Sequence, residues 1–303
     1  MPPPTPKIVA NRPAVSPTAT RRGHVFTIAL LASIPMGDLD IAAALATVRG
    51  DSRHSAILLD VDGTLAPIIE DPHKVDIPLQ IRELLPIVRD RFGLTAFVSG
   101  RNLAELRALV GLDGVAYSGN HGVEVQLADG TVLPAQVDEA ALAALRAFAR
   151  DWGSASHEVA GIWMEDKGAS LTFHYRATEN RLVAKELLER TVGADAAARR
   201  LVALSGRRSL EVHASAAVNK GTAALALLAA RPEIRHVVSL GDDRTDVDVW
   251  RVLRDRVAVG ALTDVLAIGV NAAESPQVLR EEADVLVDDV PGSLRVLQAL
   301  LAH

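Results

Sequence analysis

Ala56-Ile57-Leu58-Leu59-Asp60-Val61-Asp62-Gly63-Thr64 joins an apolar run to two aspartates. The apolar run predicts a buried strand, and side chains two residues apart on a strand point to the same side. Asp60 and Asp62 would therefore lie together at the carboxyl end of this strand, where their charges repel. A bound divalent cation, or a proton shared with a substrate, would remove that repulsion. Gly63 allows the tight turn that follows.

Short apolar runs alternate with helical patterns from residue 52 to the end of the chain. The predicted strands cover 56–59, 94–98, 114–117, 236–240, 256–259 and 284–287. The predicted helices cover 79–91, 102–110, 219–230, 244–254, 275–282 and 291–301. Asn102 and Asn219 suit helix starts. The alternation is typical of βαβ units, so we expect an α/β fold with a Rossmann-like, doubly wound parallel sheet and helices on both faces.

Residues 123–213 interrupt this alternation. Strand-like alternation of apolar and polar side chains occurs at 123–127 and 170–175, a hairpin turn is predicted at 128–131, and helical patterns cover 138–151 and 178–193. We therefore assign 123–213 to an inserted α+β cap domain, and 52–122 together with 214–303 to the core. A continuation of one sheet is the alternative.

The first 51 residues begin Met1-Pro2-Pro3-Pro4-Thr5-Pro6 and predict a flexible leader. Residues 25–34 form an apolar stretch behind Arg21-Arg22, which resembles an export signal or a short docking segment or helix. At about ten residues this stretch cannot span a bilayer as a helix, which needs roughly 20.

The composition bounds the class of protein. The 303 residues suffice for one or two domains with a large buried core. Lys and Arg total 32 against 38 Asp and Glu, and only 3% of the residues are aromatic. Nucleic-acid binding needs a basic surface and often stacking aromatics, so this composition argues against it. The sequence contains no cysteine, which excludes disulfides, thiolate zinc sites and cysteine nucleophiles.

Two polar motifs suit phosphate binding. Ser99-Gly100-Arg101 follows a predicted strand and leads into a predicted helix, whose positive dipole end attracts anions. The Ser99 hydroxyl and a backbone amide can bind phosphate oxygens, and Arg101 adds a forked, permanently charged group. Asn219-Lys220-Gly221 opens another predicted helix, where Lys220 supplies a compact positive charge.

A further motif, Gly241-Asp242-Asp243-Arg244-Thr245-Asp246, follows the predicted strand at 236–240. Its three carboxylates would lie beside Asp60 and Asp62, because ligands in such folds bind where the carboxyl ends of the strands meet. So many carboxylates are untenable together without a cation, and oxygen ligands favour Mg²⁺. Each motif alone is more typical of a turn or a helix cap, but their joint occurrence in this order favours a site.

The four motifs resemble those of the haloacid dehalogenase superfamily across roughly residues 55–300. The resemblance implies that Asp60 is the nucleophile, which attacks phosphorus and becomes an aspartyl-phosphate. It implies that Asp62 is the general acid and base, which protonates the leaving oxygen and then activates water. Ser99 and Lys220 would hold the phosphoryl group.

The same resemblance implies a Mg²⁺ cofactor. Its ligands would be Asp60, the backbone carbonyl of Asp62, and Asp242. Asp243 and Asp246 would support the metal ligands or the nearby lysine. Hydrolysis of phosphate monoesters is very slow without a catalyst, so such an enzyme must lower the barrier by roughly 20 kcal/mol or more.

Within this superfamily the chain resembles the trehalose-6-phosphate phosphatase family. The matching segments are 59–68, 118–122, 165–171, 174–176, 210–212 and 241–246. The strings Gly119-Asn120-His121-Gly122 and Glu165-Asp166-Lys167-Gly168 are the most specific. The predicted cap domain lies where the superfamily carries a C2-type cap, and it would decide the substrate.

The resemblance implies hydrolysis of trehalose 6-phosphate to trehalose and phosphate. The residues that would contact the sugar phosphate are Arg101, Asn120, His121, Glu165, Lys167 and Glu211, whose polar groups suit hydroxyls and phosphate. One alternative is a phosphatase for sucrose phosphate or a glucosyl or mannosyl glycerate phosphate, and another is a catalytically silent trehalose-6-phosphate sensor. The implied partner is a small sugar phosphate, with no nucleic acid and no membrane, and the implied location is cytoplasmic. The sequence does not determine the oligomeric state, and a monomer is favoured.

Two positions depart from the family pattern. His213-Ala214 stands where the family commonly has Arg-Pro, close to Glu211, and this change concerns recognition by the cap domain. Val247 stands where the family has an acidic residue, and this change concerns only the helix after the metal loop. We therefore expect the chemistry to survive both departures.

Overall fold

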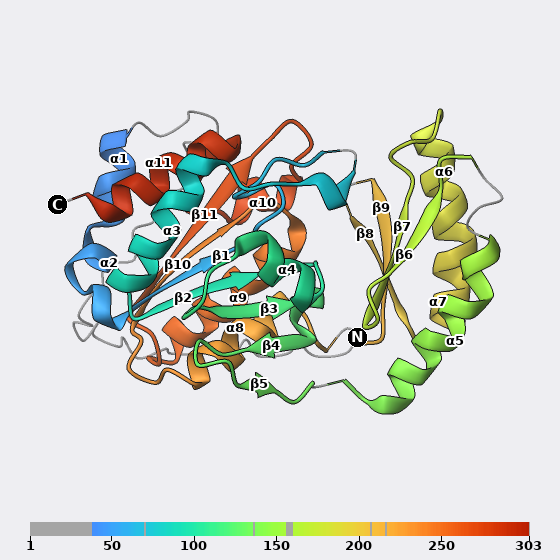
Figure 1. The fold of residues 1–303 in the computed structure, drawn as a ribbon, viewed down its shortest axis with the longest axis horizontal. Helices are drawn as coiled ribbons and strands as arrows, with labels where there is room; N and C mark the ends of the chain where they lie inside the picture. Colours follow the sequence, from blue (N-terminus) through green and yellow to red (C-terminus); the bar gives the residue numbers. More distant parts are fainter. Residues whose placement is uncertain are drawn as a thin grey trace, which may run out of the picture. The chain divides into compact units, whose positions relative to one another are not determined.

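The computed structural model describes residues 38–69, 71–135, 137–155, 160–206, 208–215 and 217–302. The predictions for residues 1–37, including the apolar stretch at 25–34, lie outside these ranges. The described chain contains an eight-stranded sheet and a separate four-stranded sheet, each with its own helices (Figure 1). No helix in the described ranges is both long enough and apolar enough to cross a membrane.

The larger sheet has the strand order β12-β11-β10-β1-β2-β3-β4-β5. Its strands are β1 (Ser55–Leu59), β2 (Leu94–Val98), β3 (Ala116–Gly119), β4 (Glu124–Gln126), β5 (Val132–Leu133), β10 (His236–Gly241), β11 (Asp264–Asn271) and β12 (Val285–Asp288). The strands from β12 to β3 pair in parallel, and β4 and β5 pair antiparallel at one edge. The strand order reverses between β1 and β10, and ligands bind in such sheets at the carboxyl ends beside that point.

Helices cover both faces of the larger sheet. They are α3 (Leu79–Arg91), α4 (Leu103–Val110), α8 (Lys220–Ala229), α9 (Arg244–Ala258), α10 (Gln277–Glu282) and α11 (Asp289–Leu301). Helices α3, α4 and α11 share one core with Ile57 and Leu59 of β1. Helices α8, α9 and α10 share a second core with Ala56 and Leu58. Because β1 supplies alternate side chains to two layers, the predicted doubly wound α/β fold is confirmed.

Two short helices precede β1, namely α1 (Asp38–Ala44) and α2 (Ala46–Gly50). Ile41, Leu45 and Val48 are at most 2% exposed and belong to the core that contains α3. Their spacing of four and three residues gives this segment one apolar face. The flexible leader predicted over 1–51 is therefore wrong from residue 38 onward, because the apolar periodicity there is that of packed helices.

One strand prediction is wrong. Residues 256–259, predicted as a strand, lie at the end of α9 and at its C-cap, and the strand of the sheet is β11 instead. Val247, Trp250 and Leu253 form the buried face of α9 at helical spacing. This packed face carries the helix past the predicted end at residue 254 and into the segment that was predicted to be a strand.

Strands β4 and β5 belong to the larger sheet and not to the predicted cap domain. Residues 120–122 have φ values of 49°, 52° and 107°, and this left-handed turn reverses the chain so that β4 runs antiparallel to β3. A hairpin turn with Gly130 at φ 91°, in the predicted position, then leads into β5. The range 123–213 therefore contributes its first two strands to the core sheet. The remaining division into core and cap stays a prediction.

The smaller sheet has the antiparallel strand order β6-β7-β9-β8. Its unit comprises α5 (Glu139–Ala155), β6 (Trp163–Asp166), β7 (Ser170–His174), α6 (Arg181–Leu188), α7 (Ala194–Ala198), β8 (Val202–Gly206) and β9 (Ser209–His213), and we call it the insert. The side chains packed with its helices are apolar, among them Leu171, Phe173, Leu210 and Val212. Glu165, Thr172 and Glu211 pair in register and, by the alternation of a strand, share the other face.

Candidate active site

Asp60 lies directly after β1, at the point where the strand order of the larger sheet reverses. Its backbone N–H donates to Leu240 O of β10 at 3.0 Å. The residue is 5% exposed, and its Oδ2 accepts a hydrogen bond from the Thr64 hydroxyl at 3.1 Å. Gly63, at φ 85°, forms a tight turn in which the Gly63 N–H donates to Ala66 O. This turn brings the Thr64 hydroxyl to Asp60.

Lys220 stands between two buried aspartates. Its Nζ donates to Asp60 Oδ1 at 2.7 Å and to Asp246 Oδ1 at 2.8 Å. Asn219, the predicted N-cap of α8, accepts from the Thr222 N–H and so places Lys220 in the first turn. Burial acts to lower the pKa of Lys220, but the two aspartates raise it above its usual value, so the lysine is charged. Burial raises the pKa of Asp60 to about 6, although Lys220 opposes this shift.

Asp246 stabilises the loop that follows β10 through hydrogen bonds. Its Oδ2 accepts hydrogen bonds from the N–H groups of Asp242 and Asp243, each at 3.0 Å, while its Oδ1 binds Lys220. Asp243 in turn accepts from the Arg244 N–H at 2.8 Å, at the start of α9. Asp246 therefore joins Lys220 to the loop that carries Asp242, whereas Asp243 serves the helix start.

Three carboxylates form an acidic cluster suited to a hard cation. Oxygens of Asp60, Asp242 and Asp246 all lie within 4.8 Å of one another. A Cβ at Gly63 would lie 2.0 Å from Asp242 Oδ2, so this carboxylate packs against the turn after β1. These three carboxylates carry more charge than Lys220 balances, and oxygen donors are what Mg²⁺ prefers. The donor set therefore fits Mg²⁺, and Asp246, whose oxygens already accept from Lys220 and from the N–H groups of Asp242 and Asp243, suits the supporting position predicted for it.

Asp62 faces Arg101 and not Lys220. Arg101 Nε and Nη2 donate to the two oxygens of Asp62, both at 2.6 Å, and Nη2 also donates to Pro72 O at 2.9 Å. Burial acts to lower the pKa of Arg101, but the forked pair with Asp62 raises it above its usual value. The two aspartates thus pair with different basic side chains, Asp60 with Lys220 and Asp62 with Arg101.

Ser99 connects the loops that follow β2 and β3. It lies directly after β2 and is 1% exposed. Its Oγ accepts from the Arg101 N–H at 3.2 Å, and its carbonyl accepts from the His121 N–H at 3.1 Å. The loops that carry Arg101 and His121 are therefore fixed to one another at the same edge of the sheet as Asp60.

Asn120 joins the larger sheet to the insert. Its Nδ2 donates to Glu124 Oε2 at 2.6 Å and to Lys167 O at 3.1 Å, and its Oδ1 accepts from the Ser170 hydroxyl at 3.3 Å. The residue is 1% exposed. Its amide is therefore engaged on both sides by the protein itself, and the partner Glu124 was not among the predicted site residues.

His121 and His213 approach one carboxylate oxygen. The Nε2 atoms of His121 and His213 lie 3.0 Å and 3.2 Å from Glu211 Oε2. Burial acts to raise the pKa of Glu211, but the two histidines lower it well below its usual range. Burial lowers the pKa of His121. His121 and Glu211 were predicted from the sequence as site residues, whereas His213 was predicted only as a departure from the family pattern.

Glu165 and Lys167 lie on the polar side of the insert. Glu165 Oε2 is 3.7 Å from Lys167 Nζ and 2.8 Å from His174 Nε2. Burial acts to raise the pKa of Glu165, but His174 and Lys167 lower it below its usual value. Trp163 stacks on His174 with ring centroids 4.0 Å apart. Neither Trp163 nor His174 was predicted as a site residue. Trp163 lies two residues before Glu165 on the same strand, and this spacing, which places both side chains on one face, could have identified it.

The structure brings the predicted residues into two neighbouring groups. The first, at the edge of the larger sheet, contains Asp60, Asp62, Ser99, Arg101, Lys220, Asp242, Asp243 and Asp246. The second, between the β3–β4 turn and the insert, contains Asn120, His121, Glu165, Lys167 and Glu211. The hydrogen bond from His121 N–H to Ser99 O connects the two groups.

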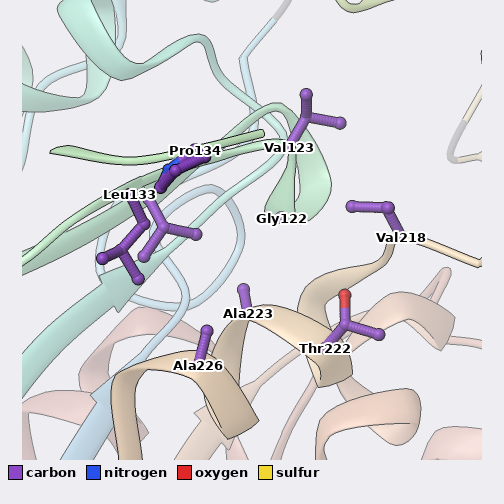
Figure 2. Close-up of a pocket in the computed structure, with 9 residues that line it drawn as sticks. Gly122, Val123, Leu133, Pro134, Val218, Thr222, Ala223 and Ala226 are labelled. Atoms are coloured by element: carbon purple, nitrogen blue, oxygen red, sulfur yellow. The ribbon is translucent and has the colours of Figure 1, made fainter. Parts of the chain in front are cut away.

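A separate apolar pocket lies between α8 and the β4–β5 hairpin (Figure 2). Its lining is Gly122, Val123, Val125, Leu133, Pro134, Val218, Thr222, Ala223 and Ala226. The Thr222 hydroxyl is engaged with the backbone of Asn219 at the start of α8. This lining offers no group for acid, base or metal chemistry, so the candidate site remains the edge of the larger sheet.

The fold and the site define a class of proteins: doubly wound α/β proteins with an acidic cluster and a lysine where the strand order reverses, and an α+β unit inserted in the chain. The chain belongs to the trehalose-phosphatase family, whose model matches residues 58–281. The matched range contains all of the predicted site residues.

Two curated relatives carry related names. The trehalose-phosphate phosphatase of Mycobacterium tuberculosis is 31% identical over 207 residues, which cover 67% of this chain and 52% of the relative. Trehalose-phosphate phosphatase B of Arabidopsis thaliana is 29% identical over 235 residues, which cover 73% of this chain and 62% of the relative. The chain thus spans less than two thirds of the length of these relatives.

A solved structure shares the fold. The C-terminal domain of the C. albicans trehalose-6-phosphate phosphatase superposes with a TM-score of 0.70 and 21% sequence identity. The match covers 88% of this chain and 97% of that domain. Most of this chain therefore shares a known fold.

Proposed function

We propose that this chain is a Mg²⁺-dependent phosphatase of the haloacid dehalogenase superfamily that hydrolyses trehalose 6-phosphate to trehalose and phosphate. The observation that carries the proposal is the buried Lys220 between Asp60 and Asp246 at the carboxyl edge of the larger sheet. A carboxylate nucleophile beside a compact cation suits phosphoryl transfer. Family membership supports the identity of the ester.

Asp60 is the nucleophile in this proposal. One of its oxygens attacks phosphorus while the bond from phosphorus to the sugar oxygen breaks, and an aspartyl-phosphate forms. Water then attacks the same phosphorus, which releases phosphate and regenerates the carboxylate. Lys220 and Ser99 hold the phosphoryl oxygens through both steps. Mg²⁺ held by Asp60, Asp242 and the backbone carbonyl of Asp62 would supply further positive charge to these oxygens, with Asp246 and Asp243 as supports.

Asp62 is the general acid and base in this proposal. Arg101 donates to both of its oxygens, so that neither oxygen faces a substrate while this pair is intact. Proton donation to the sugar oxygen therefore requires that Arg101 leaves the pair. An arriving phosphate or sugar oxygen offers Arg101 another partner, so substrate binding and release of the acid are coupled.

The role of Asp62 as general acid predicts that the effect of its substitution depends on the leaving group of the ester. Asp62→Asn should lower kcat/KM for trehalose 6-phosphate, which reports the steps up to formation of the aspartyl-phosphate, by about 10²–10⁴-fold, the range typical of a lost general acid. The loss should be much smaller for p-nitrophenyl phosphate, whose leaving group departs without a proton. Steady-state phosphate release from both esters measures the difference. Asp113→Asn, at an almost fully exposed carboxylate, is the control. Equal losses with both esters would argue against the role of Asp62.

The insert supplies the groups that recognise the sugar. Two contacts support this assignment: Asn120 donates to Lys167 O, and His121 lies 3.0 Å from Glu211, while Glu165 lies 3.7 Å from Lys167 Nζ. A disaccharide presents many hydroxyls, which carboxylates and an ammonium group can bind. We infer that the insert acts as a C2-type cap over a small sugar phosphate. A cytoplasmic location and a monomeric state remain predictions.

Truncation of Lys167 should affect affinity for the sugar more than chemistry. Lys167→Ala removes a charged hydrogen-bond donor that contributes about 1.5–3 kcal/mol, so KM for trehalose 6-phosphate should rise by roughly 10–150-fold. The kinetics with p-nitrophenyl phosphate should change little. Lys185→Ala, at a half-exposed lysine paired with Glu189 on α6, is the matched control. A KM equal to that of the control would remove Lys167 from the binding site.

Phosphate release from a panel of sugar phosphates tests the function as a whole. The panel contains trehalose 6-phosphate, sucrose phosphate, and glucosyl and mannosyl glycerate phosphates, each with Mg²⁺ and with EDTA. We expect the highest kcat/KM for trehalose 6-phosphate, loss of activity on chelation, and recovery when Mg²⁺ is restored. A better ester would overturn the substrate, and no hydrolysis in Mg²⁺ would favour the silent sensor over the enzyme.

A further inference from the structure

Two histidines and a glutamate converge where the β3–β4 turn meets β9 of the insert. The Nε2 atoms of His121 and His213 lie 3.0 Å and 3.2 Å from the same oxygen, Glu211 Oε2. One ligand atom from each residue lies within 4.8 Å of those of the other two. The rings are nearly perpendicular, at 79°, with centroids 5.1 Å apart. The three donors thus surround one small volume.

The surroundings of this cluster are closed and closely packed. The side chains of His121, Glu211 and His213 are 12%, 18% and 7% exposed. A Cβ at Gly100 would lie 2.3 Å from His121 Nε2, so the absence of a side chain at this position lets the loop approach the imidazole. The three polar groups are therefore held together by two loops and a strand.

The donor types favour a different ion from the acidic cluster. Imidazole nitrogen with one carboxylate suits Zn²⁺, Co²⁺ or Ni²⁺, whereas Mg²⁺ prefers oxygen ligands. Tetrahedral zinc with bonds of about 2.0–2.1 Å places neighbouring ligand atoms roughly 3.3 Å apart. The observed separations of 3.0 Å and 3.2 Å need only small movements to reach that spacing. Lys220 contributes positive charge near His121, but Asp60 and Asp246 bind it and Glu211 supplies a negative charge.

We propose that His121, Glu211 and His213 form a transition-metal site, typified by Zn²⁺, that is distinct from the acidic cluster of Asp60, Asp242 and Asp246. His121 comes from the larger sheet, whereas Glu211 and His213 come from the insert. A bound ion therefore joins the two parts and occupies Glu211, which the proposed function assigns to the sugar, and His121, which was predicted from the sequence to contact the sugar. Zn²⁺ should accordingly inhibit the enzyme even when Mg²⁺ is saturating.

His213 is the ligand that can be replaced without leaving Glu211 unpaired. Arginine at this position can pair with Glu211 but offers no lone pair to a metal. His213→Arg therefore preserves a donor to Glu211 while removing a ligand. It is a sharper test than truncation, because the ion pair that replaces the histidine keeps the carboxylate partnered.

Cobalt is the probe, because Co²⁺ takes zinc sites and its visible absorption reports nitrogen ligation. In the full chain we expect one equivalent of Co²⁺ with visible absorption that Zn²⁺ displaces and Mg²⁺ does not. His213→Arg and His213→Gln should each weaken Co²⁺ binding by at least about 10–100-fold. This is the loss typical when a residue that only hydrogen-bonds to a metal ligand is removed. His174→Gln, at a histidine bonded to Glu165 elsewhere on the insert, and Asp242→Asn, in the acidic cluster, should retain the absorption.

The outcomes separate the two metal sites and do not require catalysis. Absorption that persists in His213→Arg, that disappears in Asp242→Asn, or that never forms in the wild type overturns the proposal. Circular dichroism and urea unfolding of each variant establish that the chain is folded. In the phosphatase assay, Zn²⁺ should inhibit the wild type at least tenfold more potently than it inhibits His213→Arg. The absorption experiment does not depend on the substrate, so its result holds even if trehalose 6-phosphate is not hydrolysed.

Discussion

Asp60→Asn is expected to reduce turnover of trehalose 6-phosphate by about 10⁴-fold or more, because it removes the oxygen that attacks phosphorus. Asparagine has nearly the same shape, and its oxygen can accept from Lys220 while its amide N–H donates to the Thr64 hydroxyl. Lys220 keeps its hydrogen bond to Asp246. The variant should therefore fold, so that the loss of turnover reports chemistry and not unfolding.

The same variant tests the covalent step directly. Beryllium fluoride forms a phosphate-like adduct with an aspartate nucleophile, so with Mg²⁺ it should raise the Tm of the wild type and leave Asp60→Asn unchanged. Asp113→Asn, at a carboxylate 97% exposed, should keep both the activity and the shift. Turnover by Asp60→Asn within about tenfold of the wild type would contradict nucleophilic catalysis by this residue.

Segments with strong periodicity and clear boundaries could be predicted from the sequence. Helix α3 was predicted at 79–91 and is found there. Its buried residues Ile81, Leu85 and Val88 have the spacing of one helix face, and Pro78 precedes its first turn. Strand β2 was likewise predicted with its observed bounds, since all five of its residues are buried and all but Thr95 are apolar.

Strand β11 could not be predicted in the same way. Residues 256–259 and the strand that follows them both contain short apolar runs with valines, so local composition does not separate them. The choice depends on contacts: Val257 packs with the buried face of α9, whereas Val265 and Leu266 pair with Val237 and Val238 of β10. These partners are distant in sequence, and tertiary packing overrides the local preference.

The motifs predicted where the functional side chains lie, but not which partners they contact. Each motif follows a parallel strand or opens a helix, so the convergence of Asp60, Asp242 and Lys220 follows from the topology. The pairing of Asp62 with Arg101 depends on how two loops fold over the sheet edge. The contact of Asn120 with Lys167 O depends on how the insert meets the core. Periodicity carries no information on either arrangement.

Loss of Lys220 should destabilise the fold as well as abolish activity. Lys220→Met leaves Asp60 and Asp246 buried without their shared cation, and the loss of one partner from a buried ion pair costs about 3–5 kcal/mol. Lys185→Met, at an exposed lysine paired with Glu189, should cost at most about 0.5 kcal/mol. Urea unfolding in EDTA measures the free energy of unfolding of both variants, and equal losses would show that the buried cluster does not depend on its lysine.

The loss in Lys220→Met should depend on pH in a defined direction. Burial already raises the pKa of Asp60 to about 6 with the lysine present, and removal of Lys220 raises the pKa further. A carboxyl whose folded pKa lies above its unfolded value of about 3.9 is stabilising when protonated, and this contribution is lost as the pH rises through the folded pKa. The destabilisation should therefore be small near pH 4 and largest above about pH 7.

A second substitution in the same background shows whether the cost is one of unpaired charge. Asp246→Asn added to Lys220→Met removes one of the two stranded carboxylates, and its oxygen can still accept from the N–H groups of Asp242 and Asp243. The double variant should recover part of the free energy of unfolding at pH 8, because less charge remains buried, but none of the turnover, because the phosphoryl group still lacks its lysine. Recovery of turnover would mean that Lys220 acts only by stabilising the fold. A further, additive loss of stability would mean that Asp246 stabilises the loop after β10 more than its buried charge destabilises the protein.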